Sequence, residues 1–224
     1  MKSIGIIAVV FSLVAGVAAQ DAATRLPKNY QVQFENDWVR VTSVRYGANE
    51  RLPEHTHTEL PSAYVYLTDS GPVAFRHVGG PAVTRQPVKA GMFRVFRGIK
   101  ETHEVENMGA ATEFLRVELK TEGRDPATIR GKFERPPVSS EPAVQFDHAQ
   151  FIVSRVWVQP GQKLAIKADA QPALLIAMAA DAGAKPGRER WLAAGSTTQL
   201  ANAGPAPIDF LRIDFKTLPA RPRS

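Results

Sequence analysis

The sequence predicts an all-β protein built from two tandem jelly-roll β-barrels. Short runs rich in Val, Phe, Tyr and Leu alternate with Pro and Gly, as at 38–46, 63–68, 92–97 and 113–120. Short strands with regularly spaced turn signals are typical of antiparallel sandwiches and barrels. No long amphipathic helix is evident in the sequence, and the chain contains an internal repeat.

The internal repeat is clearest near the end of each copy. The run Phe-Leu-Arg-Val-Glu-Leu-Lys at 114–120 returns as Phe-Leu-Arg-Ile-Asp-Phe-Lys at 210–216. Earlier in the copies, Phe34 matches Phe146 and Val41 matches Val153. The early pairs have a larger sequence offset than the late pairs, so the second copy has a shorter middle.

The repeat divides the chain into domains. We predict an N-terminal domain at 28–121, a linker at 122–144 and a C-terminal domain at 145–218. The linker segment is rich in Pro and Ser, which favours a partly extended connection.

The first residues have the layout of a secretory signal peptide, which we place at 1–19. Lys2 precedes an apolar run at 4–17, and small residues follow at the expected cleavage site. The run is short for a membrane span, although an uncleaved anchor is the alternative. We therefore expect an exported protein, periplasmic or secreted, with no membrane association after cleavage. The chain has 0 cysteines, so its stability must come from its core rather than from disulfides.

The net charge of +6 could indicate a nucleic-acid partner. The charges are scattered, however, and no stripe of aromatic and basic residues suits a single strand. We expect no nucleic-acid partner.

Three histidines form the candidate metal site. His55 and His57 are two residues apart, and residues at this spacing in a strand point to the same side. His103, from a later segment, would supply a third imidazole. The alternative is that all three are ordinary surface or core residues.

These histidines resemble the two motifs of the cupin superfamily. Gly47, His55, His57 and Gly71 fit the first motif, while Gly91, His103 and Asn107 fit the second. The resemblance is good over 34–120 and weak over 146–216. Together with the repeat, it implies a bicupin, with two cupin-type jelly-roll barrels in tandem.

The chain departs from the family pattern at the carboxylate ligand. The family's Glu would fall near Pro61 or Ser62, and Lys100 stands where an inner Gly is expected. The resemblance therefore implies a triad of His55, His57 and His103, similar to thiol dioxygenases and some diketone-cleaving cupins. It implies one divalent transition metal, and the ligands do not distinguish Fe, Zn, Ni, Cu and Mn.

The second copy lacks this triad, which predicts a degenerate C-terminal cupin domain. The sequence offsets place Lys167, Asp169 and Thr198 at the positions of His55, His57 and His103. The other two histidines, His77 and His148, are interpreted as surface residues.

Tyr64 and Tyr66 are the candidate catalytic residues. They alternate with Ser62, so they would point inward, where a phenol could orient a substrate or donate a proton. The alternative is that they only pack the barrel. Arg94 or Arg97 could hold an anionic substrate, or both could be exposed.

Two functions fit these features, and the sequence does not decide whether the protein is an enzyme. The first is an exported metal-binding bicupin that acts as a metal-dependent oxygenase, or a related enzyme, on a small molecule. The alternative is a non-catalytic cupin that binds or senses a small ligand. An interaction module is a third reading, and the resemblance implies a homo-oligomer.

Overall fold

The computed structural model describes residues 21–178 and 185–220. The predicted signal peptide lies outside these ranges. Nearly all of the regular secondary structure in the described residues is β-strand, which confirms the all-β prediction. Its helices are one turn, α1 (Ala22–Arg25), and a 3-10 turn, η1 (Pro126–Thr128). Neither is long and apolar enough to cross a membrane.

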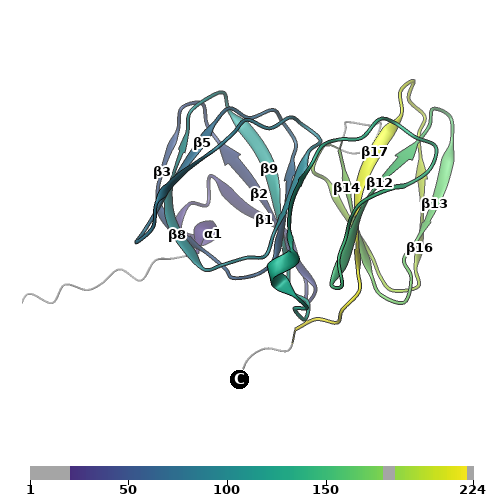
Figure 1. Cartoon of the computed structure of the whole chain (residues 1–224). Coiled ribbons are helices and arrows are strands. Elements are labelled where there is room, and N and C mark those ends of the chain that lie inside the picture. The colour runs from purple at the N-terminus through teal and green to yellow at the C-terminus, as the bar shows by residue number, and fades with distance from the viewer. Residues whose placement is uncertain (1–20, 179–184, 221–224) are drawn as a thin grey trace, which may run out of the picture.

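The N-terminal half consists of two antiparallel sheets that face each other (Figure 1). The larger sheet has the order β1 (Tyr30–Glu35), β2 (Val39–Tyr46), β9 (Thr112–Leu119), β4 (Ser62–Tyr66), β7 (Phe93–Phe96) and β10 (Arg130–Phe133). The smaller sheet has the order β3 (Arg51–His57), β8 (Glu101–Asn107), β5 (Val73–His77) and β6 (Ala82–Arg85). Neither sheet closes on itself.

The C-terminal half repeats this arrangement with fewer strands. Its larger sheet has the order β11 (Ala143–Asp147), β12 (Phe151–Val158), β17 (Ile208–Phe215), β14 (Ala173–Ala177) and β15 (Glu189–Leu192). A second sheet pairs β13 (Lys163–Lys167) with β16 (Thr197–Ala201). Even the irregularities correspond, because β1 shifts register between Val32 and Phe34 and β11 between Val144 and Phe146. The repeat in sequence therefore coincides with a repeat in strand order.

The segment that we predict as a linker, 122–144, carries regular structure. It contains η1 and β10, and β10 pairs with β7 at the edge of the six-stranded sheet. This stretch is thus an added strand of the N-terminal half, with no counterpart among the described strands of the C-terminal half.

The two larger sheets pack against each other in the middle of the molecule (Figure 1). Alternate residues of β2, β4 and β9 meet alternate residues of β12, β14 and β17 in one buried apolar cluster. Trp38, Trp191 and Phe215 lie beside it, with ring centroids 5.6 to 6.4 Å apart. The other residues of these strands point into separate clusters inside each half. The shared cluster fixes the halves relative to each other, since burial of so much apolar surface is strongly favourable.

A buried ionic cluster lies beside this apolar layer. Asp209 accepts hydrogen bonds from Arg155 at 2.9 Å and from Arg135 at 3.0 and 3.1 Å. Arg155 also donates to the Gly91 carbonyl at 2.5 Å. The side chains of Arg155 and Asp209 are fully buried. These contacts join β12 and β17 to the start of the β7 region and to the chain after β10.

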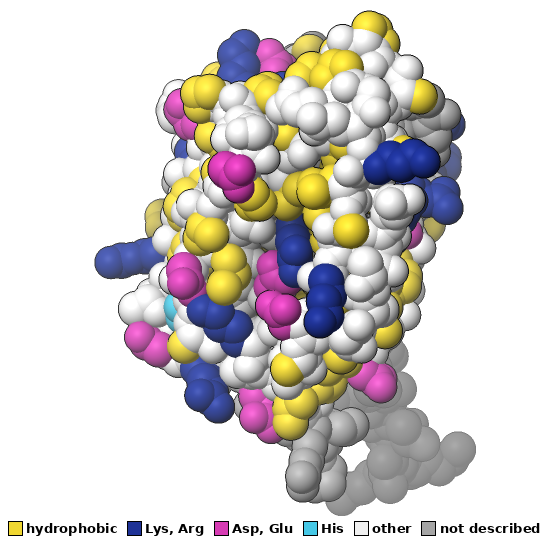
Figure 2. All heavy atoms as spheres, turned by 90° about the vertical axis from the view of Figure 1, so that its right-hand side faces the viewer, with side chains coloured by type: hydrophobic (Ala, Val, Ile, Leu, Met, Phe, Trp, Pro, Cys, Tyr) yellow, Lys and Arg dark blue, Asp and Glu magenta, His cyan; other side chains and the backbone are white. Residues whose placement is uncertain are grey.

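The outer face of the C-terminal half carries charges of both signs. Figure 2 shows Lys and Arg interspersed with Asp and Glu on this face. A mixed surface of this kind gives no broad positive field there for binding a polyanion.

Candidate metal centre

Neighbouring strands of the four-stranded sheet bring the three predicted histidines together. His55 on β3 is directly opposite His103 on β8, and His57 follows two residues later on the same face. A register shift between Leu52 and His55 determines which face of β3 carries the two histidines. All three residues are buried, with exposed fractions of 0% for His55, 8% for His57 and 2% for His103.

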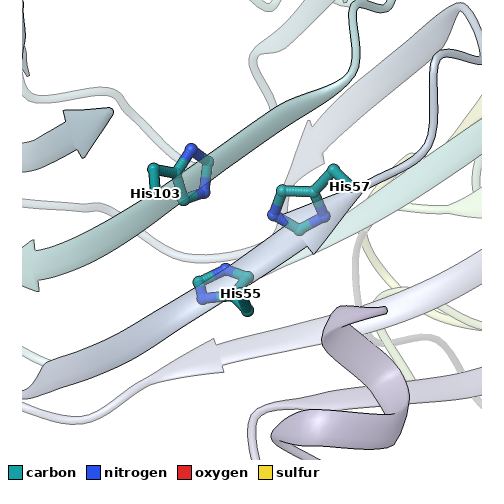
Figure 3. Close-up of side chains that lie close together, drawn as sticks. All are labelled: His55, His57 and His103. Atoms are coloured by element: carbon teal, nitrogen blue, oxygen red, sulfur yellow. The ribbon is translucent and has the colours of Figure 1, made fainter. Parts of the chain in front are cut away.

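The three rings form a nearly equilateral cluster (Figure 3). Ring centroids are 4.9 Å apart for His55 and His57, 4.9 Å for His55 and His103, and 5.0 Å for His57 and His103. One ligand nitrogen from each ring lies within 4.8 Å of the others. An ion shared by the three rings would lie about 2.0 to 2.1 Å from each ligand nitrogen.

His55 is held in a defined tautomer. Its Nδ1 lies 2.8 Å from the Pro53 carbonyl, which can only accept, so Nδ1 carries the proton. Its Nε2 lone pair accepts from the Tyr30 hydroxyl at 2.9 Å, and Tyr30 also contacts the Tyr46 hydroxyl at 3.0 Å. Tyr30 therefore lies on the lone pair that His55 would offer to a metal, and it must turn aside or become a ligand when an ion binds.

Burial keeps two of these rings neutral. It lowers the pKa of His55 to about 4, and the Pro53 hydrogen bond offsets only part of this effect. Burial, followed by the charge of Arg116, also lowers the pKa of His57 well below its usual value. Neutral imidazole is the form that binds transition metals, so both rings are in the required protonation state at neutral pH.

The metal-free protein should therefore lose stability on acidification. The folded-state pKa of His55 lies below its unfolded value of 6.5, so between pH 6.5 and about 4 the unfolded chain binds the extra proton. We expect His55 to lower the free energy of unfolding by about 3 kcal/mol as the pH falls from 6.5 to about 4. Urea titrations with chelator present would measure it. The His55→Gln variant should show a flatter pH dependence, and an equal slope in both proteins would contradict the assignment.

His103 fits a metal ion because its buried ring forms no hydrogen bond with a described residue. Neither Nδ1 nor Nε2 has a hydrogen-bond partner among the described residues, although the side chain is only 3% exposed. Leaving buried polar atoms unsatisfied costs about 1 to 3 kcal/mol each. A cation shared with His55 and His57 would satisfy one of these nitrogens.

A carboxylate also lies at this site, on a different strand from the one that the sequence motif indicates. Ser62, at the place of the family's Glu, is buried and donates to the Leu60 carbonyl at 3.0 Å. Glu101 instead places Oε2 at 3.8 Å from His103 Nδ1 and 3.1 Å from His77 Nε2. Burial raises the pKa of Glu101, but the contact with His103 and nearby Arg85 outweigh it and lower the pKa to about 2. Glu101 is thus an anion between two imidazoles.

Two histidines differ from their interpretation as surface residues. His77 is partly buried, and its ring centroid lies 5.3 Å from that of His103. His77, Glu101 and His103 form a second group whose ligand atoms lie within 4.8 Å of one another. His148 is 8% exposed, lies in the turn between β11 and β12, and its Nε2 is 3.0 Å from the Thr128 hydroxyl, far from the triad in sequence.

The two tyrosines proposed as catalytic residues point into the N-terminal half. Tyr64 and Tyr66 are 7% and 8% exposed and line a cavity of about 570 Å³. Tyr64 also lines a small recess of about 20 Å³ that His57 and His103 border. Arg94 lines the larger cavity, whereas Arg97 is exposed and does not. None of the three histidines lines the large cavity, but Tyr64, Phe75 and Phe114 border both the cavity and the recess at the triad.

The C-terminal half has two apolar residues and a threonine where the N-terminal half has its triad. Ile166 pairs with Thr198, as His55 pairs with His103, and both Ile166 and Ala168 are buried in the apolar interior. The positions inferred from sequence offsets, Lys167 and Asp169, are exposed instead. The prediction that Lys167 and Asp169 correspond to His55 and His57 is wrong by one residue, because the register shift in β3 adds a residue before His55.

No protein-family profile and no curated protein sequence matches this chain. Solved structures do match, and they are cupin-fold proteins. YhhW from Escherichia coli has a TM-score of 0.58 at 11% identity, over 86% of this chain and 91% of that one. The bacterial pirin YhhW in complex with nickel(II) gives 0.56 at 13%, over 85% and 91%. Oxalate decarboxylase of Bacillus subtilis, a protein with Mn(II) centres, gives 0.54 at 13%, over 89% and 72%. At these identities the likeness establishes the fold.

Proposed function

We propose that this chain is an exported bicupin that binds one divalent transition metal through His55, His57 and His103. In this proposal the C-terminal domain is a degenerate cupin that supports the first. The observation that carries the proposal is the buried, nearly equilateral cluster of imidazoles, one of which has no other hydrogen-bond partner. Imidazole ligands suit Fe, Zn, Ni and Cu, and Mn is used by a protein of this fold.

The bound ion would act as a Lewis acid toward an oxygen of a small molecule in the adjacent cavity. The protein's own residues would position that molecule. Tyr64 and Tyr66 offer hydroxyls on the cavity wall. Burial raises the pKa of Tyr30 well above 10.0, so its hydroxyl stays protonated and can donate a hydrogen bond beside His55. Glu101 would fix the orientation of His103.

A metal-dependent enzyme, such as an oxygenase, is the function that this arrangement favours. Three protein ligands leave coordination positions open, and the large cavity shares wall residues with the small recess that His57 and His103 border. A binding or sensing protein is the second candidate, because no described Asp, Glu or His lines the large cavity in which a small molecule would lie. Oxygen consumption by the metal-loaded protein with thiols, diketones or phenols separates the two.

Metal titration of the mature protein tests the proposal directly. We expect one equivalent of Zn²⁺ or Ni²⁺ to bind the wild type and none to bind His55→Ala/His57→Ala, because two of three ligands are gone. His148→Gln is the matched control, since it removes a buried histidine outside the triad and should leave the stoichiometry unchanged. Equal metal content in the wild type and the double variant would overturn the proposal.

A further inference from the structure

We infer that the cavity beside the triad binds a small anion with an apolar body, such as an aromatic or aliphatic carboxylate. This inference names the ligand class for the proposed function and depends on that function only for what happens after binding. The binding itself needs no metal.

The cavity has the size and apolar lining of a small-molecule site. Its volume of about 570 Å³ lies within the usual range of about 300 to 1,000 Å³. Rings and branched side chains form most of its wall, including Tyr66, Val88, Phe96 and Phe114. Such a wall favours the burial of a hydrocarbon or aromatic body.

The charges on the wall are all positive. Arg85, Arg94, Arg130 and Lys132 line the cavity, and no Asp or Glu of the described chain does. None of these four cations forms an ion pair with a described residue. Most other arginines inside or near the sheets are paired, so this set is available to a ligand.

Three of these cations lie close together on β7 and β10, and a bound anion would offset the repulsion between them. Arg94 on β7 is directly opposite Lys132 on β10, and Arg130 lies two residues away on the same face of β10. Like charges in directly opposite positions destabilise a strand pair. β10 belongs to the segment between the two repeats, so this addition to the N-terminal sheet supplies two of the four cations.

Arg85 connects the rim to the metal centre. Its guanidinium carbon lies 4.1 Å from the centroid of the Phe75 ring, and Arg85 lines both the large cavity and the small recess at the triad. The recess and the cavity also share Tyr46, Tyr64, Phe75 and Phe114. An anion held by Arg94, Arg130 and Lys132 would therefore extend its apolar body toward the histidines.

A pair of fluorescent probes tests this inference on the metal-free full-length protein. Anilinonaphthalene sulfonate is an anion with an aromatic body, and phenylnaphthylamine has a similar body without the charge. We expect the wild type to bind the sulfonate with saturable, one-site behaviour and at least tenfold more tightly than the neutral probe. Arg94→Gln/Lys132→Gln should weaken the sulfonate by about tenfold or more while leaving the neutral probe unchanged.

The control is Arg97→Gln, which removes an exposed charge at the end of the same strand and should change neither affinity. Thermal unfolding of each variant establishes that it is folded. Equal binding of the two probes to the wild type, or an unaltered sulfonate affinity in the double variant, would overturn the inference. Repeating the titration with His55→Ala/His57→Ala separates the two proposals, because anion binding should persist there even if the metal site fails its own test.

Discussion

Glu101→Gln is expected to weaken metal binding by about 10- to 100-fold. A carboxylate that holds the second nitrogen of a ligating histidine fixes its orientation and raises its basicity, and losing it typically has an effect of this size. Glu101 is the carboxylate nearest to that nitrogen, with Oε2 at 3.8 Å from His103 Nδ1, and it would come within hydrogen-bond range if the ring shifted slightly onto an ion. Its pKa of about 2 keeps it ionised. Competition with a chromogenic chelator at fixed pH would measure the change in Kd for Zn²⁺.

The matched control is Glu104→Gln. Glu104 lies on the same strand, is exposed, and should leave the affinity unchanged. The same titration also distinguishes two roles for Glu101. A positioning role predicts one equivalent of metal in both proteins with different Kd values. Two equivalents in the wild type and one in Glu101→Gln would instead make His77, Glu101 and His103 a separate metal site. An unchanged Kd at unchanged stoichiometry would contradict both.

The triad could be predicted from sequence because it depends on short-range periodicity. His55 and His57 are two residues apart on one strand, and this spacing alone places them on one face. The same reasoning applied to His103 would have found Glu101, since it lies two residues earlier on β8. The search for a carboxylate at the family's usual position directed attention to Pro61 and Ser62 instead.

Features that depend on pairing between distant strands could not be predicted in this way. His77 reaches the site only because β5 is the other neighbour of β8 and places His77 opposite His103. Tyr30 comes from the opposite sheet, and its hydroxyl hydrogen-bonds to Nε2 of His55. The exchange of His55 for Ile166 in the second half was hidden by one inserted residue in β3, which a comparison of offsets does not detect.

The contact between the two halves likewise required the structure. Neighbouring apolar residues in β4 and in parts of β2 and β9 indicate strands that are buried on both faces. The sequence shows this pattern, but it does not say what covers the outer face. The covering surface is the equivalent sheet of the second copy. This packing buries the outer face of the larger sheet in the second half, where Ile166, Ala168 and Thr198 are at the positions of the triad.

Asp209→Asn is expected to lower the free energy of unfolding by about 3 to 5 kcal/mol, the usual cost of removing one partner of a buried ion pair. Arg155 is fully buried and burial already lowers its pKa, so without Asp209 its positive charge would have only the Gly91 carbonyl as a strong partner. Arg135, 44% exposed, can turn to solvent and loses little. Urea unfolding monitored by tryptophan fluorescence would measure the change.

A double-mutant comparison separates the ion pair from side-chain packing. Asp214→Asn removes a partly exposed partner of Arg212 on the same strand and should cost less than about 1 kcal/mol. Arg155→Met combined with Asp209→Leu replaces both buried charges with apolar groups and should recover most of the loss, because the cost of Asp209→Asn is that of an uncompensated charge rather than of a missing attraction. If the double variant is as unstable as Asp209→Asn, the instability comes from lost contacts with Gly91 and Arg135. The junction would then depend on geometry at β7 rather than on charge balance.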